Sequence, residues 1–144
     1  MKDFWNSRFG ASQTEYVYGT APNVFFEQKL GTLRPGRLLL AAEGEGRNAV
    51  FAARKGWQVT AFDISEAGKK KALQLARRFG VEQAITYELA GFDTFEAPEH
   101  HFDVLGLCYA HISSSQRRAI HRKLAGMLKP GGQVILEAFS KEQL

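Results

Sequence analysis

The sequence of 144 residues contains a single cysteine, so no disulfide bond can form within the chain. This suits a reducing compartment, and we expect a cytoplasmic protein. The first ten residues, MKDFWNSRFG, lack the apolar segment of a secretory signal peptide. No apolar run approaches the roughly 20 residues that a membrane-spanning helix needs, so we expect no membrane partner.

Histidine is scarce too, with four residues in the chain. His100 and His101 are adjacent and therefore lack the spacing of metal ligands on one helix face. We find no Cys/His cluster and predict no metal site.

The net charge of +4 invites a nucleic-acid partner. The basic residues, however, lie mainly on predicted helices, at residues 69–71, 77–78, 117–118 and 122–123. The outer faces of helices are normally polar, so solvated surface explains these charges and we do not expect nucleic acid to bind.

Strand and helix signals alternate along most of the chain. A short helix is indicated at residues 20–30, capped by Thr20 and ended by Gly31. Apolar runs predict five strands, at residues 37–42, 57–62, 84–89, 102–109 and 133–139. Amphipathic patterns predict three helices between them, at residues 46–55, 65–79 (capped by Ser65, with Phe79 on the inner face) and 113–128.

This order predicts an α/β fold, a Rossmann-like doubly wound sheet of parallel strands with helices on both faces. We divide the chain into a helical lid segment, residues 1–36, and the sheet domain, residues 37–144. Ligands of such sheets bind at the carboxyl ends of the strands.

The most informative stretch is LLLAAEGEGRN at residues 38–48. An apolar strand runs into a glycine-bearing turn and a helix follows at once, which lets a ligand approach bare backbone at a helix N-terminus. Asp63 stands 17 residues beyond Gly46, at the end of the next strand. An acid at about that distance normally binds ribose hydroxyls, although a helix-capping role is the alternative. The stretch therefore predicts a nucleoside-binding site.

Two kinds of nucleoside ligand fit this turn. The loose pattern Gly44-x-Gly46-x-x-Ala49 keeps an NAD-type ligand open. Its pyrophosphate would meet Glu43 and Glu45, and like charges at that range are unfavourable by roughly 1 kcal/mol or more. S-adenosylmethionine (SAM) instead carries a sulfonium and an ammonium, and the two glutamates favour it.

Five stretches carry a family resemblance, in family order: FWNSRF at 4–9, YGTAPN at 18–23, AEGEGRNAVFAARKGWQVTAFDIS at 42–65, FDVLGLCYAH at 102–111 and LKPGGQVILEAF at 128–139. Through them the chain resembles the class I SAM-dependent methyltransferases, and within that group the tellurite-resistance-type small-molecule methyltransferases. The resemblance implies SAM as cofactor, S-adenosylhomocysteine as its product and a small-molecule methyl acceptor as partner.

The resemblance also implies site residues. Gly44 and Gly46 would lie against the methionine part of the cofactor, Asp63 on the ribose and Ile64 on the adenine. The amino edge of the adenine would lie near Glu88 and Leu89. We expect further cofactor contacts from the N-terminal segment, from the turn and its helix, and from the end of the fourth strand: Trp5, Arg8, Tyr18, Gly19, Thr20, Glu43, Arg47, Asn48 and Tyr109.

The chain departs from the superfamily pattern at three places. Leu40 replaces the acid that usually ends the first strand, and Ala42 replaces the first glycine of the turn. We infer that Glu43 supplies the missing carboxylate. We find five strands where the superfamily has seven, the usual sixth and seventh being absent. We therefore expect a truncated form, or a homodimer whose second copy covers the edge of the fifth strand.

Methyl transfer from a sulfonium is an in-line displacement, for which the protein positions the acceptor and excludes water. A soft sulfur, selenium or tellurium nucleophile needs little or no general base. A hydroxyl acceptor needs one, and His111 is the candidate catalytic residue, a structural histidine being the alternative. We expect Cys108 to be a small core residue and not a nucleophile.

Four functional hypotheses follow, in this order. The first is a small-molecule methyltransferase, and the second is a SAM-binding but catalytically degenerate domain that acts as a sensor or assembly part. The third is a nucleic-acid methyltransferase, although residues 108–111 (CYAH) lack the Asn/Asp-Pro-Pro-aromatic motif of enzymes that methylate base amino groups. A dehydrogenase is the weakest.

Overall fold

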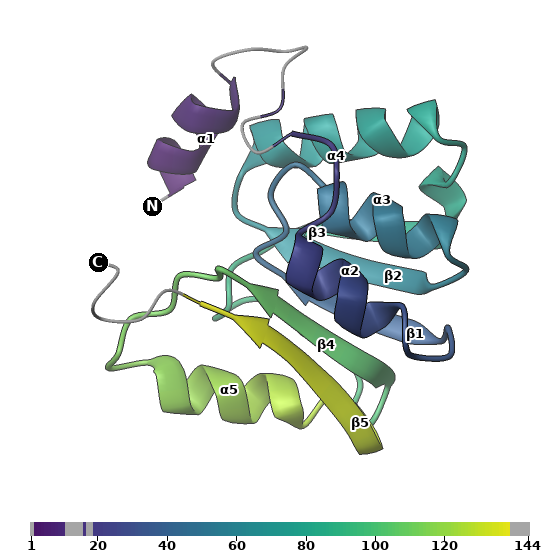
Figure 1. The fold of residues 1–144 in the computed structure, drawn as a ribbon. Coiled ribbons are helices and arrows are strands. Elements are labelled where there is room, and N and C mark those ends of the chain that lie inside the picture. The colour runs from purple at the N-terminus through teal and green to yellow at the C-terminus, as the bar shows by residue number, and fades with distance from the viewer. Residues whose placement is uncertain (1, 11–15, 17–18, 139–144) are drawn as a thin grey trace.

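The computed structural model describes residues 2–10, 16 and 19–138. Five strands form one sheet in the order β3-β2-β1-β4-β5, and each neighbouring pair is parallel. The strands are β1 (Arg37–Ala41), β2 (Gln58–Asp63), β3 (Ile85–Leu89), β4 (Phe102–Cys108) and β5 (Leu128–Glu137). The predicted Rossmann-like α/β fold is confirmed (Figure 1).

Helices cover both faces of this sheet (Figure 1). They are α1 (Lys2–Gly10), α2 (Val24–Leu30), α3 (Arg47–Arg54), α4 (Glu66–Arg78) and α5 (Arg117–Ala125), with a short 3₁₀ turn, η1 (Glu82–Ala84), before β3. In Figure 1, α2, α3 and α4 lie on one side of the sheet and α5 lies on the other.

The apolar run of β1 builds two cores because successive side chains of a strand point to opposite faces. Leu38 and Leu40 pack into the cluster with the helices α2, α3 and α4, whereas Leu39 packs into the cluster with α5. Each of these leucines is almost fully buried and contributes about 1.5–3 kcal/mol relative to exposure. This central strand therefore carries the turn that follows it on a rigid base.

Two predicted helix caps have different outcomes. The Ser65 cap is confirmed, because Ser65 Oγ accepts from the Gly68 N–H at 3.0 Å. The Thr20 cap is wrong: α2 begins at Val24, and the Oδ1 of Asn23 accepts from the Phe26 N–H at 2.9 Å. Thr20 and Asn23 both carry a side-chain acceptor, and the helix starts directly after Asn23, three residues later than predicted.

Two further predictions need correction. Phe79 does not pack inward but is 38% exposed, with the Arg54 guanidinium 4.2 Å from its ring centre. The LKPGG segment is not a turn outside the fifth strand. It forms an irregularity inside β5, where the pairing passes from Phe102 with Leu128 to Val104 with Gln133.

The edge strand β5 carries two half-exposed apolar side chains, Val134 and Leu136. A homodimer that covers this edge remains a prediction, and sedimentation velocity at several protein concentrations measures it. Among the described residues, no helix has the length and apolar character to cross a membrane.

Candidate functional site

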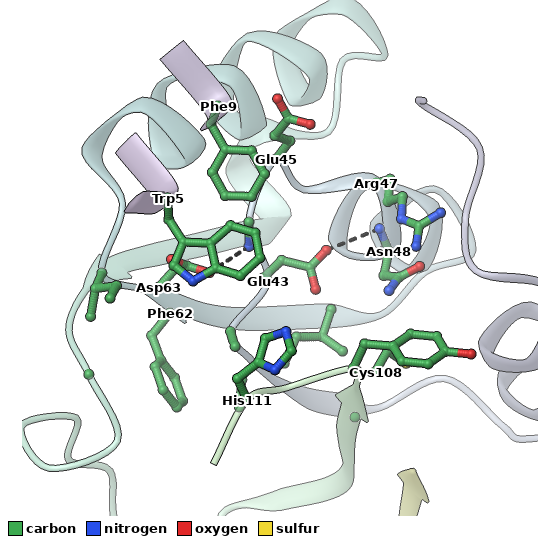
Figure 2. A pocket seen from close by; sticks show the side chains of 18 of the residues that line it. Trp5, Phe9, Glu43, Glu45, Arg47, Asn48, Phe62, Asp63, Cys108 and His111 are labelled. Carbon is green, nitrogen blue, oxygen red and sulfur yellow. Dashed lines mark hydrogen bonds between the residues drawn. The ribbon is translucent and has the colours of Figure 1, made fainter. Parts of the chain in front are cut away.

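The carboxyl ends of β1, β2 and β4 border a cavity of about 450 Å³. It lies at the point where the chain order of the sheet reverses, between β1 and β4, which is where ligands of such sheets bind. Twenty-one residues line it, and Figure 2 shows most of their side chains. The position agrees with the prediction that a ligand binds at the carboxyl ends of the strands.

The turn after β1 depends on left-handed backbone. Gly46 has a φ of 88°, and a Cβ on it would lie 2.6 Å from the Cβ of Ala72 in α4. Glycine therefore lets α3 and α4 approach each other closely. Ala42, the departure from the glycine pattern, also has a positive φ of 54°, which costs a residue with a side chain about 1–2 kcal/mol.

Glu43 caps α3 from inside the cavity. Its Oε1 accepts from the N–H group of Asn48 at 3.0 Å (Figure 2) and from that of Ala49 at 2.9 Å. Such amides satisfy a carboxylate well, because a helix N-terminus carries partial positive charge. Burial nevertheless raises the pKa of Glu43 to about 7, so its charge changes near neutral pH.

Asp63 holds the turn from the end of β2. Its Oδ2 accepts from the Gly44 N–H at 2.9 Å and its Oδ1 accepts from the Ser65 N–H at 3.0 Å. Burial raises its pKa, and these backbone bonds act in the opposite direction. Each oxygen has a second lone pair, so the carboxylate can still accept from a ligand hydroxyl.

Glu45 does not act together with Glu43, contrary to the electrostatic interpretation of the sequence. Its Oε2 lies 2.9 Å from the Nζ of Lys71 on α4, and both side chains are about 5% exposed. Figure 2 shows Glu45 turned away from Glu43. The negative charge that meets a ligand therefore comes from Glu43 and Asp63.

Aromatic side chains of α1 close one side of the cavity. The Trp5 ring stacks on Phe9 at 5.3 Å and on His111 at 5.9 Å between centroids. Figure 2 shows Trp5 between these two rings, with His111 on the opposite wall. Asn6 anchors α1, because its Oδ1 accepts from Ser65 Oγ at 2.8 Å. Helix α1, which belongs to the segment predicted as a lid, thus reaches the site.

The end of β4 forms the wall opposite the turn. Cys108 is half-buried: it packs against the core cluster, as expected, and it also lines the cavity. Burial, with the nearby charges of Glu43 and Glu137, raises the pKa of its thiol to about 12. The thiol is therefore protonated at neutral pH, as expected for a residue that is not a nucleophile. The next residue, Tyr109, donates its hydroxyl to Glu137.

Asn48 joins the cavity to α2. Its Oδ1 accepts from the backbone N–H of Asn23 at 2.8 Å, and both side chains are buried. Asn23 Nδ2 lies 3.5 Å from Glu137 Oε1, the oxygen that also accepts from Tyr109. This network aligns the start of α3 with the ends of β4 and β5.

The structure brings ten of the sixteen sequence-predicted site residues to the cavity lining: Trp5, Gly19, Glu43, Gly44, Arg47, Asn48, Asp63, Ile64, Tyr109 and His111. Five others lie outside the lining: Arg8, Thr20, Gly46, Glu88 and Leu89. Tyr18 lies outside the described residues. Gly46 packs behind the turn, and the side chains of Glu88 and Leu89 are exposed on β3.

Sequence reasoning missed several lining residues, among them Phe9, Phe62, Gly91 and Phe92. Residues 90–92 line the side of the cavity where we expected Glu88 and Leu89. These lining residues follow directly after the end of β3 at Leu89. The spacing of Trp5 and Phe9, four residues apart on one helix face, is a signal that could have indicated Phe9. Among the described residues, no group of His, Cys, Asp and Glu could hold a metal ion.

Comparison of the sequence with models of known protein families shows to which family this chain belongs. The model of the "Methyltransferase domain" family matches residues 39–132, which include the turn, Asp63 and β4. The chain belongs to this methyltransferase family. The match covers the sheet from β1 to the start of β5 and most of the cavity.

Individual proteins agree with this assignment. The chain is 30% identical over 86 residues to the ubiquinone/menaquinone biosynthesis C-methyltransferase UbiE of Shewanella sediminis, covering 60% of this chain and 34% of that protein. The chain thus spans about a third of the length of most of the curated relatives it matches. The narrower resemblance to tellurite-resistance-type enzymes stays a prediction.

Solved structures share the fold. The PH0226 protein from Pyrococcus horikoshii OT3 matches with a TM-score of 0.77 at 16% identity, over 99% of this chain and 64% of that one. The 1,6-didemethyltoxoflavin-N1-methyltransferase of Burkholderia thailandensis, solved with bound 1,6-didemethyltoxoflavin and S-adenosylhomocysteine, matches with a TM-score of 0.62 at 24% identity, over 76% of this chain and 46% of that one.

Proposed function

We propose that this protein is a SAM-dependent methyltransferase that acts on a small-molecule acceptor. The observation that carries the proposal is the cavity at the switch point of the sheet, in which Glu43 and Asp63 face a ligand beside a glycine turn. Two carboxylates favour a cationic ligand over a pyrophosphate. Membership of the methyltransferase family supports the same ligand.

The cavity residues suit the parts of this cofactor. When bound, SAM supplies a methyl group already activated on a sulfonium. Asp63 accepts from the ribose hydroxyls, and the apolar walls formed by Phe62 and Ile64 hold the adenine. Trp5 and His111 exclude water from the side that the acceptor enters.

The acceptor enters beside Trp5, Tyr109 and His111 in this proposal. A soft sulfur, selenium or tellurium atom needs little or no general base there. A hydroxyl acceptor would use His111, whose exposed ring lines the cavity at its mouth. Cys108, with its thiol protonated, forms part of the wall.

Ligand binding is tested by thermal unfolding with S-adenosylhomocysteine. At a ligand concentration of about 100 Kd, binding adds roughly 2.7 kcal/mol of stability, which corresponds to a rise in Tm of about 5–10 °C. We expect Asp63→Ala to remove most of this rise, because the ribose loses its acceptor. Asp103→Ala is the matched control, since Asp103 lies at the opposite end of the sheet beside Lys129 and Arg37.

The absence of any shift with the native protein at millimolar ligand would contradict the proposal. Asp63→Asn, which retains one acceptor oxygen for the Gly44 or Ser65 amide, separates a lost ligand contact from a distorted turn. Transfer of a labelled methyl group to thiol, selenide and telluride acceptors then distinguishes an enzyme from a degenerate SAM-binding domain, which would bind without turnover.

A further inference from the structure

We propose that Glu43 is the counterion of the ligand's ammonium group, in place of an acid at the end of β1, and that ligand binding therefore strengthens as the pH rises through neutrality. This inference rests on the proposed function and deepens it. It concerns one carboxylate of the cavity and the part of the ligand that this carboxylate contacts.

The position of Glu43 supports this role. The same oxygen, Oε1, accepts from both the Asn48 and Ala49 amides, which fixes the carboxylate at the start of α3. The other oxygen points into the cavity, towards the wall formed by Cys108 and His111 (Figure 2). A cation that reaches this oxygen completes a charge-assisted hydrogen bond in a partly buried site.

No other carboxylate at the end of β1 is placed for this contact among the described residues. Leu40, which stands where the family pattern has an acid, packs on Gly106 and Phe26 in the apolar core. Glu45 is turned towards Lys71. Asp63 accepts from backbone amides on both of its oxygens and lies on β2, at the ribose side of the turn.

The electrostatic surroundings of Glu43 make its charge sensitive to pH. Burial raises its pKa to about 7; the neighbouring Asp63 raises this pKa further, and Arg47 and the two amides lower it. The other ionisable groups of the cavity lining are Glu45, Arg47, Asp63, Cys108, Tyr109 and His111. Behind the lining, Tyr87 on β3 interacts electrostatically with Glu43, and Glu137 on β5 does so with Cys108.

The sign of the pH dependence follows from these charges. Below about pH 7 Glu43 is largely protonated and offers no negative charge. An α-ammonium group stays protonated up to about pH 8, so the ligand keeps its charge over the same range. The affinity should therefore increase roughly five- to tenfold between about pH 6 and about pH 7.5.

Calorimetric titration with two ligands tests the proposal. One ligand is S-adenosylhomocysteine, and the other is its deamino analogue, which lacks only the ammonium. Glu43→Gln is the test variant, because a glutamine oxygen can still accept from the Asn48 and Ala49 amides. Glu99→Gln is the matched control, since it makes the same charge change at an exposed residue that does not line the cavity.

We expect Glu43→Gln to weaken S-adenosylhomocysteine binding by roughly 10- to 100-fold, as for the loss of a charged hydrogen bond. Binding of the deamino analogue should stay within about twofold, and the pH dependence should disappear. Glu99→Gln should change neither affinity.

Three outcomes would overturn the inference. A variant that keeps both the ligand preference and the pH profile shows that Glu43 does not contact the ammonium. Equal weakening of both ligands shows that Glu43 acts only by holding the turn. A native protein that binds neither ligand removes the proposed function together with the inference, whereas the first two outcomes leave the proposed function standing.

Discussion

A Lys71→Met variant is expected to unfold with about 3–5 kcal/mol less free energy than the native protein. Lys71 Nζ and Glu45 Oε2 lie 2.9 Å apart, and both side chains are about 5% exposed. Removing the ammonium leaves the buried Glu45 carboxylate without this counter-charge. The free-energy cost of keeping that carboxylate away from water is then no longer offset by Lys71. Because a domain is stable by only about 5–15 kcal/mol, this loss is large.

Equilibrium unfolding in urea measures the effect. The double variant Glu45→Gln with Lys71→Met should recover much of the loss, because it removes both charges. Lys129→Met is the matched control: its partner Asp103 lies 3.2 Å away, but both side chains are well exposed, and such pairs contribute about 1 kcal/mol or less. Similar losses for the two single variants would show that burial of the Lys71 pair is not what stabilises it.

Gly46→Ala is expected to destabilise the protein by about 2–5 kcal/mol. Two terms add: a left-handed backbone costs an alanine about 1–2 kcal/mol, and overpacking costs about 1–3 kcal/mol. The added Cβ would lie 2.6 Å from the Cβ and 2.8 Å from the Cα of Ala72. The second contact involves the backbone of α4, which cannot turn aside as a flexible side chain can.

Gly80→Ala isolates the first of these two terms. Gly80 has a φ of 68°, and a Cβ there would meet nothing within 4 Å. We expect this control to lose only about 1–2 kcal/mol in urea unfolding. If the two alanine variants were equally stable, close approach of the turn to α4 would not be the reason for glycine at position 46.

The sheet could be predicted from the sequence because its signals are local. Apolar runs separated by amphipathic helices placed β1 to β4 within one or two residues at either end. The predicted start of β5 was five residues too late, because the Lys129–Gly132 segment has the composition of a turn. In the structure this segment lies inside β5, at the register shift in its pairing with β4. The Phe79 prediction was wrong because helical spacing assigns a side chain to one face of a helix but does not specify what packs against it. Phe79 meets the Arg54 guanidinium and not the apolar core.

The glutamates of the turn show what the sequence by itself determines about this protein. It determines the strand, the glycine turn, the helix and the distance to Asp63, because each depends on neighbours in the chain. It also places Glu43 and Glu45 at the same turn. Only the tertiary structure assigns them different roles, since Lys71, on another helix, pairs with Glu45 and the amides of α3 hold Glu43 in the cavity. The energy of a charge depends on what lies within a few ångströms in space, and residue spacing along the chain does not specify that.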